Sequence, residues 1–321
     1  MSESLVQRVK SWAARWGEAW SSFWFVEREA HALAVIRIAC GGMLAYIHLI
    51  WLIRLSDFLG PNAWIDRDSI QTIHQNDWAW SWLFYTDSPW LTGAHETIAL
   101  LASLMMMLGL LTRVAIPVAW FFTLMTCHRL TLSLFGLDQI VVMLAMYLML
   151  ANSGAVWSMD RRLFSASKSA SGDPRWWIAL SKRTVNNNIA TRLIQIHLCV
   201  IYLFGGLGKM RGEMWYEGSA MWFTIVNYEY QSLDLTWIGK SPMLIATLSA
   251  TTIFWETFYC ALVWPKLTRP LVLATAFFVH AGIAIGLGMV TFGVIMIVAN
   301  FAFIDPAVFR HLFERSKLEK A

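Results

Sequence analysis

Apolar residues occur in long blocks that short polar segments separate. A helix of about 18–23 residues crosses roughly 30 Å of hydrocarbon, because each residue adds 1.5 Å along the axis. Eight stretches approach that length, at about 32–53, 94–112, 114–132, 138–153, 190–208, 243–264, 270–287 and 289–304. The pattern therefore predicts an all-α integral membrane protein, folded as a bundle of about eight transmembrane helices.

A different pattern precedes the first block. Residues 5–30 (LVQRVKSWAARWGEAWSSFWFVEREA) place basic residues and aromatic rings at helical spacing. Such a segment is typical of an amphipathic helix that lies in the membrane interface. We therefore expect three parts: an interfacial helix at 1–30, a transmembrane domain at 31–305 and a basic cytoplasmic tail at 306–321.

Composition agrees with a membrane protein. Of the 321 residues, 57% are hydrophobic and 14% are charged, with a mean hydropathy of +0.51. A soluble domain carries roughly 25% charged residues. The four cysteines lie in apolar blocks and form no C-x-x-C pair, so neither a disulfide framework nor a metal site is predicted. Nothing indicates binding to nucleic acid, and the expected surroundings are the lipid bilayer.

The basic residues predict an orientation. If both termini are cytoplasmic, the inner segments hold seventeen Lys or Arg, while the outer segments hold Arg67, Arg211 and Lys240. The excess of basic residues on the cytoplasmic side of membrane proteins favours this arrangement. We therefore expect a multi-pass protein of a bacterial inner membrane with two long outer segments, an acidic, Trp-rich one at 55–92 and a second at 210–242.

The fifth block holds the most informative polar residues. Six positions recur at steps of three and four and so share one helical face: Arg192, Gln195, Cys199, Tyr202, Gly206 and Lys209. The glycines around the end of the block leave the backbone uncovered. This permits close approach by a neighbouring helix or by a flat ligand.

Lys209, at the outer end of that face, has two interpretations. Its stem could lie in the apolar region while its amine reaches the headgroups. Alternatively, it could act as a base at the mouth of an outward-facing pocket, since removal from water favours the neutral amine that a base requires. The glycines before it and the run Trp215-Tyr216-Glu217 after it favour the second interpretation.

Five further residues are candidates for a pocket. Glu256 and His280 lie deep in the sixth and seventh blocks, where a charged residue costs at least about 2.5 kcal/mol on insertion scales. We expect Glu256 to pair with a buried Arg or His. His128 and Arg129 end the third block and Asp138 opens the fourth, so the predicted topology places them near the level of the lysine. Arg129 and Asp138 are expected to form an ion pair.

Several segments together carry a resemblance to a known family. After LFGLDQIVVMLAMYLMLANSGAVWSMDRRL come LIQIHLCVIYLFGGLGKMRGEMWYEGSAM, FWET and FFVHAGIAIGLGMVTFGVIM. This order resembles the HTTM family, the membrane domain shared with vitamin K-dependent gamma-carboxylases. The similarity covers roughly residues 30–304, so the chain would be a short form without the large C-terminal domain.

The resemblance implies base chemistry at one lysine. In the carboxylases, a lysine in this segment is the base toward vitamin K hydroquinone. Oxygenation of the quinol then yields a strong base that removes a glutamate γ-proton, and CO2 adds. Lys209 is the matching position, followed by Met210 where the carboxylases have a second lysine, and Tyr202, Gln195 and Trp215 would line the pocket. A lyase that uses a reduced lipid quinone with O2 and CO2 is therefore expected, acting on a peptide or protein substrate.

Two other hypotheses belong to different functional classes. Short bacterial proteins that resemble this family occur beside secreted peptides, so the protein could serve maturation, export or immunity toward such a peptide without being an enzyme. Segment 55–92 would then be the contact surface. A transporter is the third hypothesis, in which Glu256 and His280 would relay protons.

Overall fold

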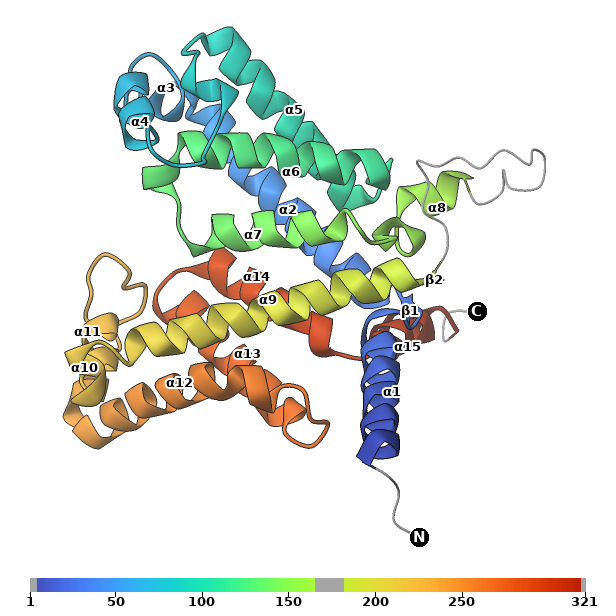
Figure 1. Ribbon diagram of the computed structural model, residues 1–321. Coiled ribbons are helices and arrows are strands. Elements are labelled where there is room, and N and C mark those ends of the chain that lie inside the picture. The colour runs from blue at the N-terminus through green and yellow to red at the C-terminus, as the bar shows by residue number, and fades with distance from the viewer. Residues whose placement is uncertain (1–4, 165–181, 319–321) are drawn as a thin grey trace.

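The fold is helical throughout. The computed structural model describes residues 5–164 and 182–318, and within these ranges the only strands are two of two residues each. Eight helices coincide with the eight predicted apolar blocks (Figure 1). They are α2 (His31–Ile53), α5 (Pro89–Leu108), α6 (Thr112–Arg129), α7 (Gly136–Leu148), α9 (Val185–Lys209), α12 (Pro242–Leu262), α13 (Arg269–Gly286) and α14 (Val290–Asn300). The prediction of an all-α fold is confirmed.

Fewer helices than predicted are long and apolar enough to cross a membrane. Among the described residues these are α2, α5, α9 and α13, and a fifth crossing requires counting Val290–Phe303 with Pro306–Leu312, a pair bent by 111°. The 13 residues of α7 and the 11 of α14 reach only about 20 Å and 17 Å. Polar residues lower the hydropathy of α6 and α12. By length and composition the structure thus supports four or five spans, and not eight.

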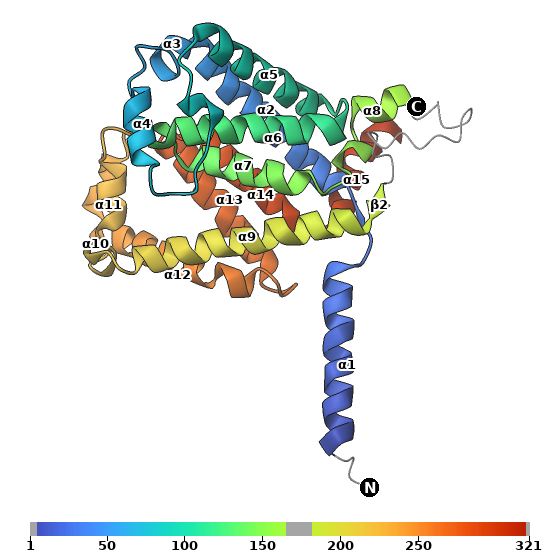
Figure 2. The ribbon, with the colours of Figure 1, turned by 45° about the horizontal axis from the view of Figure 1, so that its top comes forward.

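The two ends of the bundle carry different segments, as both views show (Figures 1 and 2). At one end lie α3 (Leu55–Phe58), α4 (Arg67–Ile73), α10 (Glu213–Tyr216) and α11 (Ala220–Ile225). At the other end lie α8 (Met159–Phe164), β1 (Arg28–Glu29), β2 (Arg183–Thr184) and α15 (Pro306–Leu318). The segments that the sequence predicts to be outer therefore gather at the first end, and the described parts of the inner segments gather at the second.

The second end joins the N-terminal and C-terminal segments. β1 pairs with β2 in antiparallel register, and Glu29 of β1 accepts from Arg310 of α15 at 2.8 Å. Before β1, helix α1 (Leu5–Trp24) extends away from the bundle (Figure 2), and its Trp12, Trp16 and Trp20 are exposed. A helix is therefore present in this segment, while its amphipathic role and its place in a membrane interface stay predictions.

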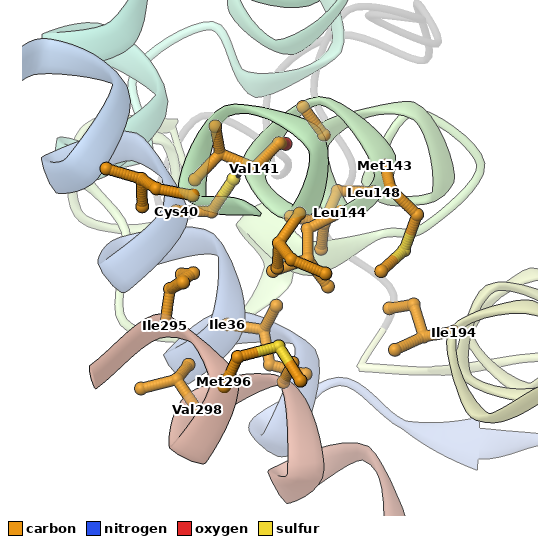
Figure 3. Packing of buried hydrophobic residues seen from close by; sticks show 14 of the residues in the cluster. Ile36, Cys40, Val141, Met143, Leu144, Leu148, Ile194, Ile295, Met296 and Val298 are labelled. Atoms are coloured by element: carbon orange, nitrogen blue, oxygen red, sulfur yellow. Dashed lines mark hydrogen bonds between the residues drawn. The ribbon is translucent and has the colours of Figure 1, made fainter. Parts of the chain in front are cut away.

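Part of the hydrophobic core lies where α2, α7, α9 and α14 meet (Figure 3). The buried side chains at this junction include Ile36, Cys40, Val141, Leu144, Leu148, Ile194, Ile295 and Met296. Cys40 is a free thiol whose Sγ donates to the carbonyl of Val141 at 3.4 Å, so it joins α2 to α7. The other three cysteines are also free.

A glycine fixes the contact between α9 and α12. A Cβ atom added to Gly206 would lie 2.5 Å from Thr257 Oγ1 and 2.7 Å from the Thr257 backbone nitrogen. Only glycine lets the two backbones approach this closely, as the glycine-rich end of the fifth block predicts. Gly208, two residues later, faces open space, since nothing lies within 4 Å of an added Cβ.

We predict that Gly206→Ala lowers the stability of the detergent-purified protein. The new methyl group has to displace backbone rather than a flexible side chain, and overpacking of this kind costs about 1–3 kcal/mol. A lower midpoint of thermal unfolding, followed by circular dichroism, measures the effect. Gly208→Ala is the matched control and should unfold at or above the wild-type midpoint, because alanine favours helix and meets no neighbour here. Equal midpoints for the two variants would contradict the close contact.

Candidate functional site

The first polar feature of the bundle is an ion pair between α9 and α12. Lys209, the last residue of α9, donates from Nζ to Glu256 Oε2 at 2.6 Å, and the two side chains are 29% and 13% exposed. Gly205 leaves space for this contact, because a Cβ there would lie 3.3 Å from Glu256 Oε2. The expected partner of Glu256 was a buried Arg or His, and this prediction is wrong: the partner is the span-end lysine.

Two neighbours shape the surroundings of the amine. The Trp215 ring, on α10, lies with its centroid 5.6 Å from Lys209 Nζ, within reach of a cation–π interaction. The open space beside Gly208 lies one residue before the lysine. Phe204 and Leu207 on the same stretch of α9 are exposed apolar side chains. The pair thus sits beside an apolar surface with room next to the backbone.

A second polar group lies deeper in the bundle. Tyr202 Oη and His280 Nε2 are 2.7 Å apart, and Asn300 Nδ2 donates to Tyr202 Oη at 3.0 Å. Tyr259 in turn donates to Asn300 Oδ1 at 2.6 Å. The four residues come from α9, α13, α14 and α12, and all are buried. This chain of hydrogen bonds joins the four helices.

One ring nitrogen of His280, Nδ1, has no hydrogen-bond partner in the described structure. The His280 side chain is 4% exposed. A buried polar atom without a partner is uncommon, because it loses water without replacement. If Nε2 accepts from Tyr202, then Nδ1 carries the proton.

Gln195, predicted to share the pocket, lies elsewhere. It is on the same buried face of α9, but about 21 Å from Lys209 along the helix axis. Its Nε2 donates to the Ala302 carbonyl at 2.7 Å and its Oε1 accepts from Arg192 at 2.9 Å. Gln195 and Lys209 therefore share one face of α9, as predicted, but they are too far apart to line the same pocket.

His128, Arg129 and Asp138 also have separate roles. His128 Nδ1 lies 2.7 Å from the Trp80 carbonyl, and Arg129 Nη2 donates to the Ile65 carbonyl at 3.1 Å. Asp138 instead accepts from the backbone N–H of Phe135 at 3.0 Å and caps α7. The expected Arg129–Asp138 ion pair is therefore absent from the described contacts, since the two basic residues hold segment 55–92 onto α6.

The sequence did not predict a third buried group on α2, α5 and α6. His48 Nδ1 lies 2.7 Å from Glu96 Oε2 and its Nε2 lies 2.8 Å from Thr123 Oγ1. Thr126 donates to Glu96 Oε1 at 2.8 Å and contacts His95 Nε2 at 2.9 Å. These side chains are at most 1% exposed. Glu96 lies near the start of its apolar block, where an acidic side chain is usually solvated. The adjacent His95 was the one sequence feature that could have indicated a buried polar group here.

Segment 55–92 is a folded surface rather than an irregular loop. Asp66 caps α4 through Ser69, and Asp77 accepts from His74 at 2.7 Å. The His74 hydrogen bond, and then the Ala79 N–H, lower the pKa of the exposed Asp77 carboxyl. The aromatic side chains that this segment exposes are Trp64, Trp78, Trp80, Tyr85 and Trp90.

A cavity of about 700 Å³ opens at the same end of the molecule. It lies between α11, the start of α12 and the turn before α12, and Trp222, Lys240 and Ala246 are among its lining residues. Its lining includes neither Lys209 nor Glu256. Among the described residues, no group of three or more His, Cys, Asp or Glu side chains is arranged to hold a metal ion.

Comparison with known proteins assigns no activity. No protein-family model matches the chain, and no solved structure matches it. Over 148 residues it is 28% identical to the uncharacterised protein YitO of Bacillus subtilis, an alignment that covers 42% of this chain and 48% of YitO. The chain thus matches about half the length of this relative, whose name gives no function.

The buried His48–Glu96 group predicts a specific stability effect. Glu96→Ala removes the acceptor of His48 and Thr126 together, and each buried polar group left without a partner costs about 1–3 kcal/mol. We expect a clear fall in the midpoint of thermal unfolding in detergent. Glu229→Ala, which removes an exposed carboxylate, is the control and should leave the midpoint unchanged. A Glu96→Ala protein as stable as wild type would argue against the network.

Proposed function

We propose that this protein is a multi-pass membrane enzyme of the carboxylase-like HTTM type, in which Lys209 is the base toward a reduced lipid quinone. The observation that carries this proposal is the Lys209–Glu256 pair, with Nζ and Oε2 2.6 Å apart at an apolar helix surface. A structural ion pair would also satisfy both charges. The open space at Gly208 and the aromatic ring of Trp215 beside the amine favour a ligand-binding role.

The residues present fit a flat, lipid-soluble quinol. The space beside Gly208 adjoins the exposed apolar residues of α9, so a ligand could arrive from the bilayer without crossing water. The Trp215 ring offers a face for stacking, and aromatic pairs prefer offset or edge-to-face contacts. His280 Nδ1 is a further buried polar atom without a hydrogen-bond partner in the described structure. A reduced quinone, when bound, would supply the O–H group whose deprotonation precedes reaction with O2.

Lys209 and Glu256 then have defined parts in moving a proton. Lys209 Nζ has to be neutral before it can accept a proton, and Glu256 Oε2 is the acceptor within hydrogen-bond distance for the ammonium proton. The neutral amine can then take the quinol proton. Tyr202 and Asn300 hold the His280 ring in place between α9, α13 and α14. Carboxylation with CO2, a lyase reaction, follows from the family resemblance and not from these contacts.

We infer a cytoplasmic position for both termini in a bacterial inner membrane. The excess of basic residues in the predicted inner segments supports this orientation. So does the meeting of β1, β2 and α15 at one end of the bundle, opposite α3, α4, α10 and α11 (Figures 1 and 2). Lys209 would then act toward the outer side, and any peptide or protein substrate would approach from there.

The base role predicts a loss of quinol chemistry when the lysine cannot release a proton. The measurement is O2-dependent consumption of menaquinol by purified protein in mixed micelles with bicarbonate. Lys209→Arg keeps a cation beside Glu256 but stays protonated, so it should fold and lose about 10²- to 10⁴-fold in rate. Lys240→Arg, an equal change at a lysine away from the pair, should keep the wild-type rate.

The contradicting outcome is a Lys209→Arg protein that unfolds like wild type and consumes menaquinol at the same rate above the protein-free background. It would remove Lys209 as base. A wild-type protein without any activity above background would remove the quinol proposal itself.

One observation favours the non-enzymatic alternative. Segment 55–92 exposes several aromatic rings, with Trp78 fully and Trp64 71% exposed, on a surface that hydrogen bonds hold to α6. Exposed aromatic clusters of this kind are typical of protein contact surfaces. A secreted peptide that docks there could be matured, exported or neutralised without chemistry at Lys209.

The two candidate functions predict opposite results in cells. The test is complementation of a strain that lacks the gene. The alternative predicts that the double variant Trp64→Ser and Trp78→Ser fails to restore the wild-type phenotype, while Lys209→Arg restores it. The enzyme proposal predicts the reverse. Trp237→Ser, a similarly exposed tryptophan outside segment 55–92, is the control for loss of an exposed ring.

A further inference from the structure

A second cavity lies at the opposite end of the molecule from Lys209, where the predicted inner segments meet. Its volume is about 470 Å³. The junction of α1 and β1 forms one wall, the first turns of α9 another, and the α12–α13 turn and the start of α15 complete it. No part of the Lys209 site lines it, so its role is independent of the proposed enzyme activity.

Four arginines line this cavity, Arg28, Arg183, Arg192 and Arg269. The hydrogen bonds of three of them, Arg28, Arg192 and Arg269, go to neutral acceptors. Arg28 Nη2 donates to the Ala302 and Ile304 carbonyls at 3.4 Å and 3.3 Å, and its buried Nε has no hydrogen-bond partner in the described structure. Arg192 donates from Nε to the Phe23 carbonyl at 3.1 Å and from Nη1 to an amide oxygen.

The third, Arg269, follows the same pattern. It donates to the Val263 and Trp264 carbonyls at 3.0 Å and 2.5 Å. The sequence alone did not predict that Arg28, Arg192 and Arg269 lie together, because they come from three segments far apart in the chain.

Arg28, Arg192 and Arg269 have no carboxylate hydrogen-bond partner among the described residues. Glu29, on the cavity wall, is already paired with Arg310. Asp305 accepts from the Ala307 backbone N–H at 2.9 Å and acts on Arg28 only through its charge. Burial, and then the positive charge of Arg192, lower the pKa of Arg28 to about 10, which still leaves it protonated at neutral pH. Arg28 and Arg192 therefore repel each other in a cavity whose lining also includes Glu27, Glu29 and Asp305.

Such a cluster is complementary to an anion. Charges removed from water are stabilised when an opposite charge and hydrogen bonds replace the lost solvation. The planar guanidinium presents parallel N–H donors that match phosphate oxygens, and its contact with phosphate is short and strong. The unpartnered Nε of Arg28 is a donor available for that purpose.

We propose that this cavity binds a phosphate-class anion, and that the anion is the headgroup of an anionic phospholipid in the inner leaflet. Two features favour a lipid over free phosphate. The ring of Phe23 lies 4.2 Å from the Arg192 guanidinium carbon and that of Trp264 lies 5.9 Å away, and such aromatic rings are common at headgroup level. The wall at α1 continues into a helix with exposed tryptophans. Basic pockets at the cytoplasmic ends of membrane helices bind acidic headgroups in this way.

The test measures lipid binding to the intact, detergent-purified chain. Native mass spectrometry follows titration with phosphatidylglycerol, with phosphatidylcholine of the same acyl chains, or with inorganic phosphate alone. We expect saturable phosphatidylglycerol binding that Arg192→Gln weakens about tenfold or more, the effect of losing one charge-assisted contact. Arg192→Lys, which keeps the charge, should retain part of the affinity. Arg162→Gln, an exposed arginine at the same end, should bind like wild type.

Each outcome is decisive. Phosphate binding without preference for phosphatidylglycerol, sensitive to Arg192→Gln, retains the anion site and overturns the lipid. Equal weakening by Arg162→Gln and Arg192→Gln shows general attraction to the basic face and overturns the site. Equal binding of the two lipids by wild type, with no response to phosphate, also overturns it. Unfolding midpoints of the variants, measured without lipid, separate a lost site from a lost fold.

Discussion

The arrangement of the helices depends on satisfying charged groups among apolar residues, and the contact between Lys209 and Glu256 shows this most directly. A lone charge near the centre of a membrane helix costs about 2.5–3.5 kcal/mol on insertion scales. Glu256 lies too far along α12 to reach the end of its helix, so its partner has to come from a neighbouring element. α9 provides that partner at its last residue, and Gly206 lets the two backbones come close enough for Nζ and Oε2 to meet.

The same constraint recurs at two other places. His48 and Glu96 satisfy each other between α2 and α5, with threonines of α6 completing the network. Tyr202, His280 and Asn300 join α9, α13 and α14. At the end of the bundle that holds β1, β2 and α15 the constraint is only partly met. There Arg28, Arg192 and Arg269 donate to carbonyls and an amide, and to no carboxylate among the described residues. Fully satisfied groups are suited to holding a fold, whereas donors without a partner are available to a ligand.

The sequence predicted the helices well and their partners poorly. The apolar blocks predicted the positions of the eight helices to within about five residues. Block and helix coincide because a chain in an apolar environment has to satisfy its backbone hydrogen bonds internally, which a helix does. Block length overestimated the number of spans, since α7 and α14 are short and α6 and α12 carry many polar residues. Helical periodicity placed Gln195 and Lys209 on one face of α9, but it could not show that the two residues contact different groups at opposite ends of the bundle. The partners of Glu256 and Glu96 come from helices remote in sequence, which no local pattern reveals.

The most direct test of the account is a double-mutant cycle on the pair itself. The midpoint of thermal unfolding is measured in detergent for Lys209→Met, Glu256→Leu and the double variant. Each single change should lower the midpoint, because it leaves one charge unpaired at an apolar surface, and the double variant should recover most of the loss. Losses that simply add in the double variant would show that the two side chains do not depend on each other, and would contradict the account.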